Sequence, residues 1–88
     1  MNSAIHARLR ALSIAILGAP VDFQKLNWTY AGLHQGSSQR DRFSHAIATR
    51  GDTVVDRVVR EKGIIRAGSD EQLLDIYKRW IRDYCARV

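Results

Sequence analysis

Two aspartates four residues apart come closest to a catalytic pair in this 88-residue sequence. On a helix, Asp52 and Asp56 would share one face, and paired carboxylates can bind Mg²⁺ or exchange protons. A plainer interpretation makes Asp52 the N-terminal cap of a helix and pairs Asp56 with Arg60 at i+4. We favour the plainer interpretation and predict no catalytic residues.

The other candidate metal ligands and nucleophiles are scattered along the chain. No two of His6, His34 and His45 are spaced at i, i+4, and no cysteine lies near them, so we predict no metal site and no cofactor. The single cysteine, Cys85, falls on an apolar helix face without a base beside it, which is typical of a core or interface residue. An enzyme would require Asp52, Asp56 and a histidine to converge in a pocket.

Basic residues are concentrated in the middle of the chain. The sequence has 14 Lys and Arg against 9 Asp and Glu, a net charge of +5. Residues 40–66 carry seven bases and four acids, whereas residues 67–88 carry four of each. Arginine prevails over lysine, and its planar guanidinium suits phosphate and carboxylate groups. The predicted binding residues for nucleic acid or an acidic partner are Arg40, Arg42, Arg50, Arg57, Arg60, Lys62 and Arg66.

The spacing of two of these predicted binding residues allows two interpretations. Arg57 and Arg60 lie three residues apart on one expected helix, where they could meet consecutive phosphates. The alternative is an ordinary solvated face, balanced by Asp56 and Glu61.

Aromatic side chains are concentrated in the last 12 residues, at Tyr77, Trp80 and Tyr84. They form part of the apolar face of the last expected helix, so packing in the core is the first interpretation. If the core is filled without them, they are candidate anchors of a dimer or partner interface.

Helical periodicity and capping signals recur along the whole sequence. The expected helices are residues 3–17, a segment capped by Asp22, a short helix capped by Ser38 that ends at Gly51, a helix capped by Asp52 that ends at Gly63, and a last helix capped by Ser69. Valines in the fourth segment permit a strand, but their i, i+1, i+4, i+5 spacing favours a helix. The sequence therefore predicts an all-α fold, with residues 1–88 forming a single small domain of four to five short helices.

One stretch resembles a known family. Two segments resemble parts of the ribonuclease III domain: Ala31-Gly32-Leu33-His34 with Ser37, and Gly51-Asp52-Thr53-Val54-Val55, in which Asp52 lies eighteen residues after His34. The resemblance covers residues 16–62. The family's catalytic Glu, four residues before the signature Asp, corresponds to Ala48, and its second acidic pair would fall beyond Val88. The resemblance therefore implies a catalytically inactive helical scaffold, dimeric or associated with RNA, in which only Asp52 matches the metal site.

The N-terminal sequence and the composition indicate in which compartment of the cell we expect the protein. No stretch approaches 18 consecutive apolar residues, so we expect no membrane span. The first 21 residues lack acids, which leaves an organellar targeting segment open, but the i, i+4 spacing of apolar residues favours an integral helix and a cytoplasmic protein. A single free cysteine fits a reducing compartment.

These observations predict a small, basic, non-catalytic binding or regulatory domain. It would act by docking on an acidic protein or a nucleoprotein complex, as an accessory subunit or inhibitor. The alternative is a helical RNA- or DNA-binding domain. A homodimer remains open under either interpretation.

Overall fold

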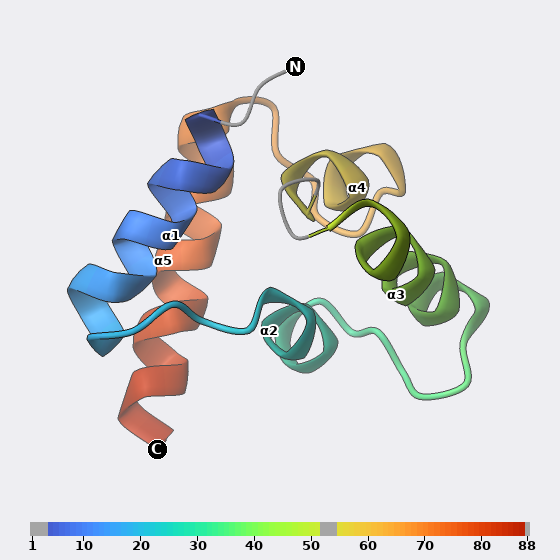
Figure 1. Ribbon diagram of the computed structural model, residues 1–88, viewed down its shortest axis with the longest axis horizontal. Coiled ribbons are helices and arrows are strands. Elements are labelled where there is room, and N and C mark those ends of the chain that lie inside the picture. Colours follow the sequence, from blue (N-terminus) through green and yellow to red (C-terminus); the bar gives the residue numbers. More distant parts are fainter. Residues whose placement is uncertain (1–3, 52–54, 88) are drawn as a thin grey trace.

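Five helices follow one another in the computed structural model, which describes residues 4–51 and 55–87 (Figure 1). These two ranges contain no strand, so the all-α prediction of four to five short helices is confirmed. None of the helices within them is long and apolar enough to cross a membrane. The helices are α1 (Ala4–Leu17), α2 (Phe23–Tyr30), α3 (Ser38–Arg50), α4 (Val55–Glu61) and α5 (Asp70–Arg87).

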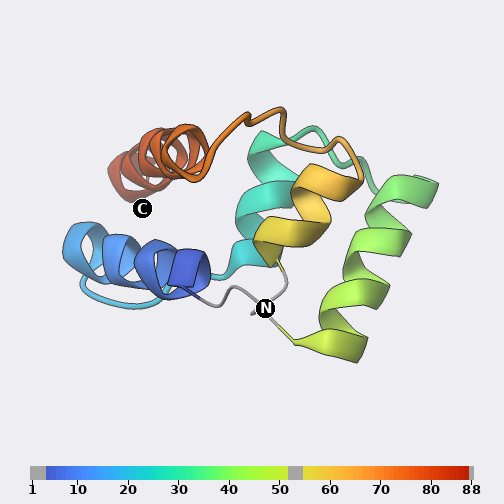
Figure 2. The same cartoon turned by 90° about the horizontal axis from the view of Figure 1, so that it is seen from above.

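The first and last helices lie side by side and run in the same direction (Figures 1 and 2). The chain between them contains the other three helices. Seen from above, α2 and α4 occupy the middle of the molecule, and α3 lies on the side away from α1 and α5 (Figure 2).

Local capping sets most of the helix boundaries. The carboxylate of Asp22 accepts a hydrogen bond from the backbone N–H of Lys25 at 3.2 Å, as predicted. Gly51, at φ 85°, ends α3 in a conformation that L side chains rarely adopt. The Ser69 hydroxyl accepts from Gln72 N–H at 3.2 Å and caps the last helix. The predicted cap Asp52 lies outside the described residues.

The cap of α3 differs from the prediction by one residue. Ser37, not Ser38, has the extended backbone of a capping residue (φ −74°, ψ 146°), and its hydroxyl accepts from Arg40 N–H at 3.2 Å. Ser38 is already helical. Both residues are serines, so only the backbone conformation distinguishes them.

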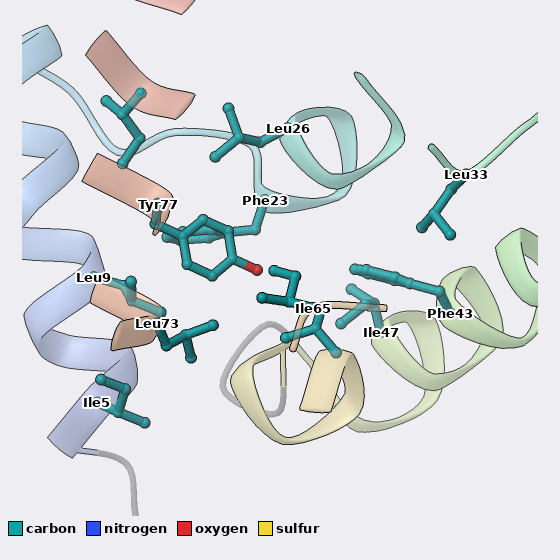
Figure 3. Packing of buried hydrophobic residues seen from close by; sticks show 12 residues of the cluster. Ile5, Leu9, Phe23, Leu26, Leu33, Phe43, Ile47, Ile65, Leu73 and Tyr77 are labelled. Atoms are coloured by element: carbon teal, nitrogen blue, oxygen red, sulfur yellow. The ribbon is translucent and has the colours of Figure 1, made fainter. Parts of the chain in front are cut away.

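The buried side chains form one continuous cluster to which all five helices contribute (Figure 3). Tyr77 is fully buried, and Figure 3 shows it among Phe23, Leu9 and Leu73. Its hydroxyl exchanges hydrogen bonds with the side chain of Asn27, which is also fully buried. This polar pair joins α2 to α5 inside an otherwise apolar core.

Candidate functional site

A shallow groove between α3 and α4 brings together three of the predicted binding residues. We call it the α3/α4 groove; its volume is about 280 Å³. Its lining combines bases, one acid, small polar groups and two apolar side chains: Arg42, His45, Ala46, Thr49, Arg50, Val58, Glu61 and Lys62.

The helical repeat of α3 places the residues that form one side of the groove. Arg42, Ala46 and Arg50 follow at i, i+4 and i+8 and therefore share a face. An adjacent face of the same helix is buried through Phe43 and Ile47, which fixes the rotation of α3. The bases are thus held at the surface by the packing of the residues next to them.

The end of α4 supplies the opposite side. The Gln39 side chain donates a hydrogen bond to the Lys62 carbonyl at 3.4 Å, which joins the beginning of α3 to the residue after α4. Lys62 N–H bonds the Val58 carbonyl at 3.0 Å, so the chain keeps a helical turn up to this point. Val58 is 1% exposed and forms the floor of the groove.

The groove carries an uncompensated positive charge. Arg42, Arg50 and Lys62 are exposed, and no ion pair within the described ranges involves any of them. Glu61 is the only carboxylate in the lining. Three cations against one carboxylate make an attractive contact for anionic groups at neutral pH.

Two other predicted binding residues are engaged within the protein. The Arg40 guanidinium lies over the Trp28 ring, 3.8 Å from its centre, and so links α3 to α2. Arg60 forms an ion pair with Asp70 at 2.9 Å and links α4 to the start of α5. Arg60 would have to leave Asp70 to meet a phosphate beside Arg57, and the expectation that these two arginines meet consecutive phosphates stays a prediction.

The remaining predicted bases lie elsewhere. Arg57 is partly buried on α4 and does not line the groove. Arg66, in the loop before α5, lines a separate hollow with Arg79. The structure thus divides the predicted seven-residue stretch between at least two surfaces.

The aromatic residues of α5 pack mainly within the chain. Tyr77 is 0% exposed and belongs to the core, which corrects its assignment as a candidate interface residue. Trp80 is partly buried and stacks on Tyr30, with 5.7 Å between the ring centres. Tyr84 is also partly buried, and Lys25 Nζ lies 5.9 Å from its ring centre. Trp80 and Tyr84 both pack against the hydrophobic core and keep only part of their surface for another molecule.

Other chemistry finds little support in the described residues. They contain no group of three or more His, Cys, Asp or Glu side chains able to hold a metal ion. Cys85 is partly buried, and its thiol lies 3.9 Å from the Ile16 carbonyl oxygen. The predicted pairing of Asp52 and Asp56 involves side chains outside the part that the structure describes.

Sequence reasoning missed five of the groove's lining residues, namely His45, Ala46, Thr49, Val58 and Glu61. Glu61 was considered only as a charge that balances the bases, and the other four received no role in binding. The i, i+4, i+8 spacing of Arg42, Ala46 and Arg50 could have indicated that they share a face. Nothing local could have indicated that Lys62 returns to the same face, because that depends on how α4 packs on α3.

No family model, curated protein or solved structure matches the chain. Function has therefore to be inferred from the residues and their geometry, and the resemblance to the ribonuclease III domain stays a prediction.

Proposed function

We propose that this chain is a non-catalytic basic binding module that docks on an acidic segment of a protein partner through the α3/α4 groove. The observation that carries the proposal is the convergence of Arg42, Arg50 and Lys62 around one groove, without ion-pair partners among the described residues. An accessory subunit or an inhibitor of a larger assembly would need this kind of surface.

The mixed lining of the groove supports a protein partner. The lining combines two apolar side chains, Ala46 and the almost fully buried Val58, with three exposed bases. Protein interfaces have this arrangement, with an apolar centre, a polar rim and a preference for arginine. A segment bearing carboxylates could bind the bases while a small apolar side chain rests on the floor.

The volume of the groove supports contact with the surface of a larger partner more than enclosure of a small molecule. Pockets for drug-sized ligands have volumes of about 300–1,000 Å³ and enclose most of the ligand. The α3/α4 groove, at about 280 Å³, lies just below that range. It suits one or two side chains of a larger partner. The lining contains no Phe, Tyr or Trp side chain on which a nucleic-acid base could stack, and His45 supplies its only ring.

A charge-reversal experiment tests the proposal. The tagged Arg42→Glu/Arg50→Glu variant and the wild type are isolated from the native cell after nuclease treatment, and co-purifying proteins are quantified by mass spectrometry. Both arginines are exposed, so we expect the variant to fold. We expect the recovery of the partner to fall about tenfold or more, because each lost charge pair becomes a repulsion.

The matched control is Arg79→Glu/Arg82→Glu, which changes the net charge equally on the outer side of α5. We expect it to retain the partner. Equal loss in both variants would mean that only net charge matters, and retention in both would mean that the groove is not the contact site. Either result overturns the proposal. A homodimer and a cytoplasmic location stay predictions that this experiment does not address.

A further inference from the structure

The charges of α5 are more unevenly arranged than its sequence indicates. Three of its four acids are held in ion pairs, so that a base locally neutralises each of these carboxylates. The pairs are Asp70 with Arg60 at 2.9 Å, Glu71 with Arg8 at 2.8 Å and Asp83 with Arg87 at 2.8 Å.

The remaining charges gather on one side of the helix. Asp75, Lys78, Arg79 and Arg82 follow at i, i+3, i+4 and i+7 and share a face. Two adjoining hollows have Asp75 and Arg79 in common, and Arg66 lines the first of them. We call Arg66, Lys78, Arg79 and Arg82 the α5 basic face. No ion pair within residues 4–51 and 55–87 involves any of these four bases.

We propose that the α5 basic face binds the phosphodiester backbone of a nucleic-acid duplex without regard to its sequence. Lys78 and Arg82 are separated by about 6 Å along the helix axis. Duplex DNA carries one negative charge per roughly 1.7 Å of its axis, so several phosphates come within reach of a row this long. Arginine can also bind a phosphate through two parallel hydrogen bonds.

The lining favours a duplex backbone over other polyanions. No aromatic side chain lines either hollow, so there is no platform for unpaired bases. Ile76 is the only apolar side chain in the first hollow, and the second has none. These two hollows therefore lack the apolar centre of a protein interface, although Asp75 and Lys78 also line a third hollow with Ala11, Leu12 and Leu74.

The two surfaces can act together. Figure 2 shows α5 and α3 on opposite sides of the molecule, with α2 and α4 between them. Simultaneous occupation would place a protein and a nucleic acid on either side of this domain. The inference goes beyond the proposed function and does not depend on it, because the two sites share no residue.

Salt-dependent binding tests the inference directly. The full chain is titrated into a fluorescently labelled 20-base-pair DNA duplex, and the affinity is measured by anisotropy at several NaCl concentrations. Four contacts predict a slope of log K against log salt of about −3.6. In Arg79→Gln/Arg82→Gln the slope should fall in magnitude by about 2, with affinity at low salt about tenfold lower or more.

Two further variants sharpen the result. Asp75→Asn removes the carboxylate from the face and should tighten binding. Arg42→Gln/Arg50→Gln makes the same change of net charge in the α3/α4 groove and should leave the slope unchanged. Circular dichroism serves to check that each variant is folded.

Three outcomes would overturn the inference. They are no measurable binding at low salt, an equal fall in slope in the groove variant, and tighter binding to phosphatidylserine vesicles than to the duplex. Any of these outcomes would leave the proposed binding of a protein partner unaffected. The purification that tests that proposal is done after nuclease treatment, and its loss of partner is expected only on substitution of Arg42 and Arg50.

Discussion

Replacing Tyr77 with phenylalanine would remove a single buried hydroxyl from the contact between α2 and α5. That hydroxyl accepts a hydrogen bond from Asn27 Nδ2 at 2.9 Å and donates one to Asn27 Oδ1 at 3.2 Å. Asn27 Nδ2 would keep its bond to the Phe23 carbonyl at 2.8 Å, whereas Oδ1 would lose this donor in a fully buried position. Loss of a partner by a buried polar group costs about 1–3 kcal/mol.

This cost is large for so short a chain. At roughly 0.05–0.15 kcal/mol per residue, the free energy of unfolding is about 4–13 kcal/mol. We expect urea denaturation of Tyr77→Phe to show a loss of about 2 kcal/mol, and thermal denaturation a midpoint lower by about 8–16 °C.

A double substitution provides the control. Asn27→Leu/Tyr77→Phe replaces both polar partners with apolar groups of similar size, and it should recover much of the lost stability. The reasoning would be refuted if Tyr77→Phe alone changed the free energy of unfolding by less than about 0.5 kcal/mol, the range of ordinary surface substitutions.

Three further predictions concern stability. Burial, the hydrogen bond to Asp83 and the charge of that carboxylate raise the pKa of Tyr30 above 10.0. The contribution of the Tyr30 hydroxyl to the free energy of unfolding should therefore be fully present below that pH and should be lost as the pH rises through the raised pKa. Tyr30→Phe should abolish this loss in urea titrations at alkaline pH, and persistence of the loss would contradict the assignment. Gly51→Ala should lower the free energy of unfolding by about 1–3 kcal/mol, because φ 85° and ψ 170° lie in a region that is essentially restricted to glycine, and no atom lies within 4 Å of an added Cβ to cause a clash. An unchanged denaturation midpoint would argue against that conformation. Asp22→Ala should cost about 1 kcal/mol through loss of the α2 cap, whereas Asp22→Asn should cost little. Equal loss in both would exclude capping as the cause.

The helices could be predicted largely because their signals are local. Asp22 and Ser69 each bond a backbone N–H three residues away, and Gly51 directly follows the helix that it ends. Phe43 and Ile47 are spaced at i, i+4, which is typical of a buried helix face, and both are buried. The error at Ser37 arose between adjacent residues of the same type, where only backbone conformation decides.

The binding residues were harder to predict because their roles depend on distant partners. Nothing near Arg40 in the sequence shows that Trp28 lies beneath its guanidinium. Tyr77 could be identified as apolar and helical, but its partner Asn27 is 50 residues away. Sequence spacing indicates which side chains share a helix face and leaves open what that face contacts.

The charge of a segment is therefore a poor guide to the charge of a surface. Residues 67–88 sum to zero, yet ion pairs that hold three of their acids leave a basic outer face on α5. Residues 40–66 have an excess of bases, yet Arg40 and Arg60 are engaged by Trp28 and Asp70. Once these contacts are discounted, two basic surfaces with different linings remain, and the second takes only Arg66 from the basic stretch. The apolar floor of the α3/α4 groove suits a protein, whereas the α5 basic face has cations in a row and suits a phosphate backbone. Matched variants at the two sites can therefore separate binding of a protein from binding of a nucleic acid at constant net charge.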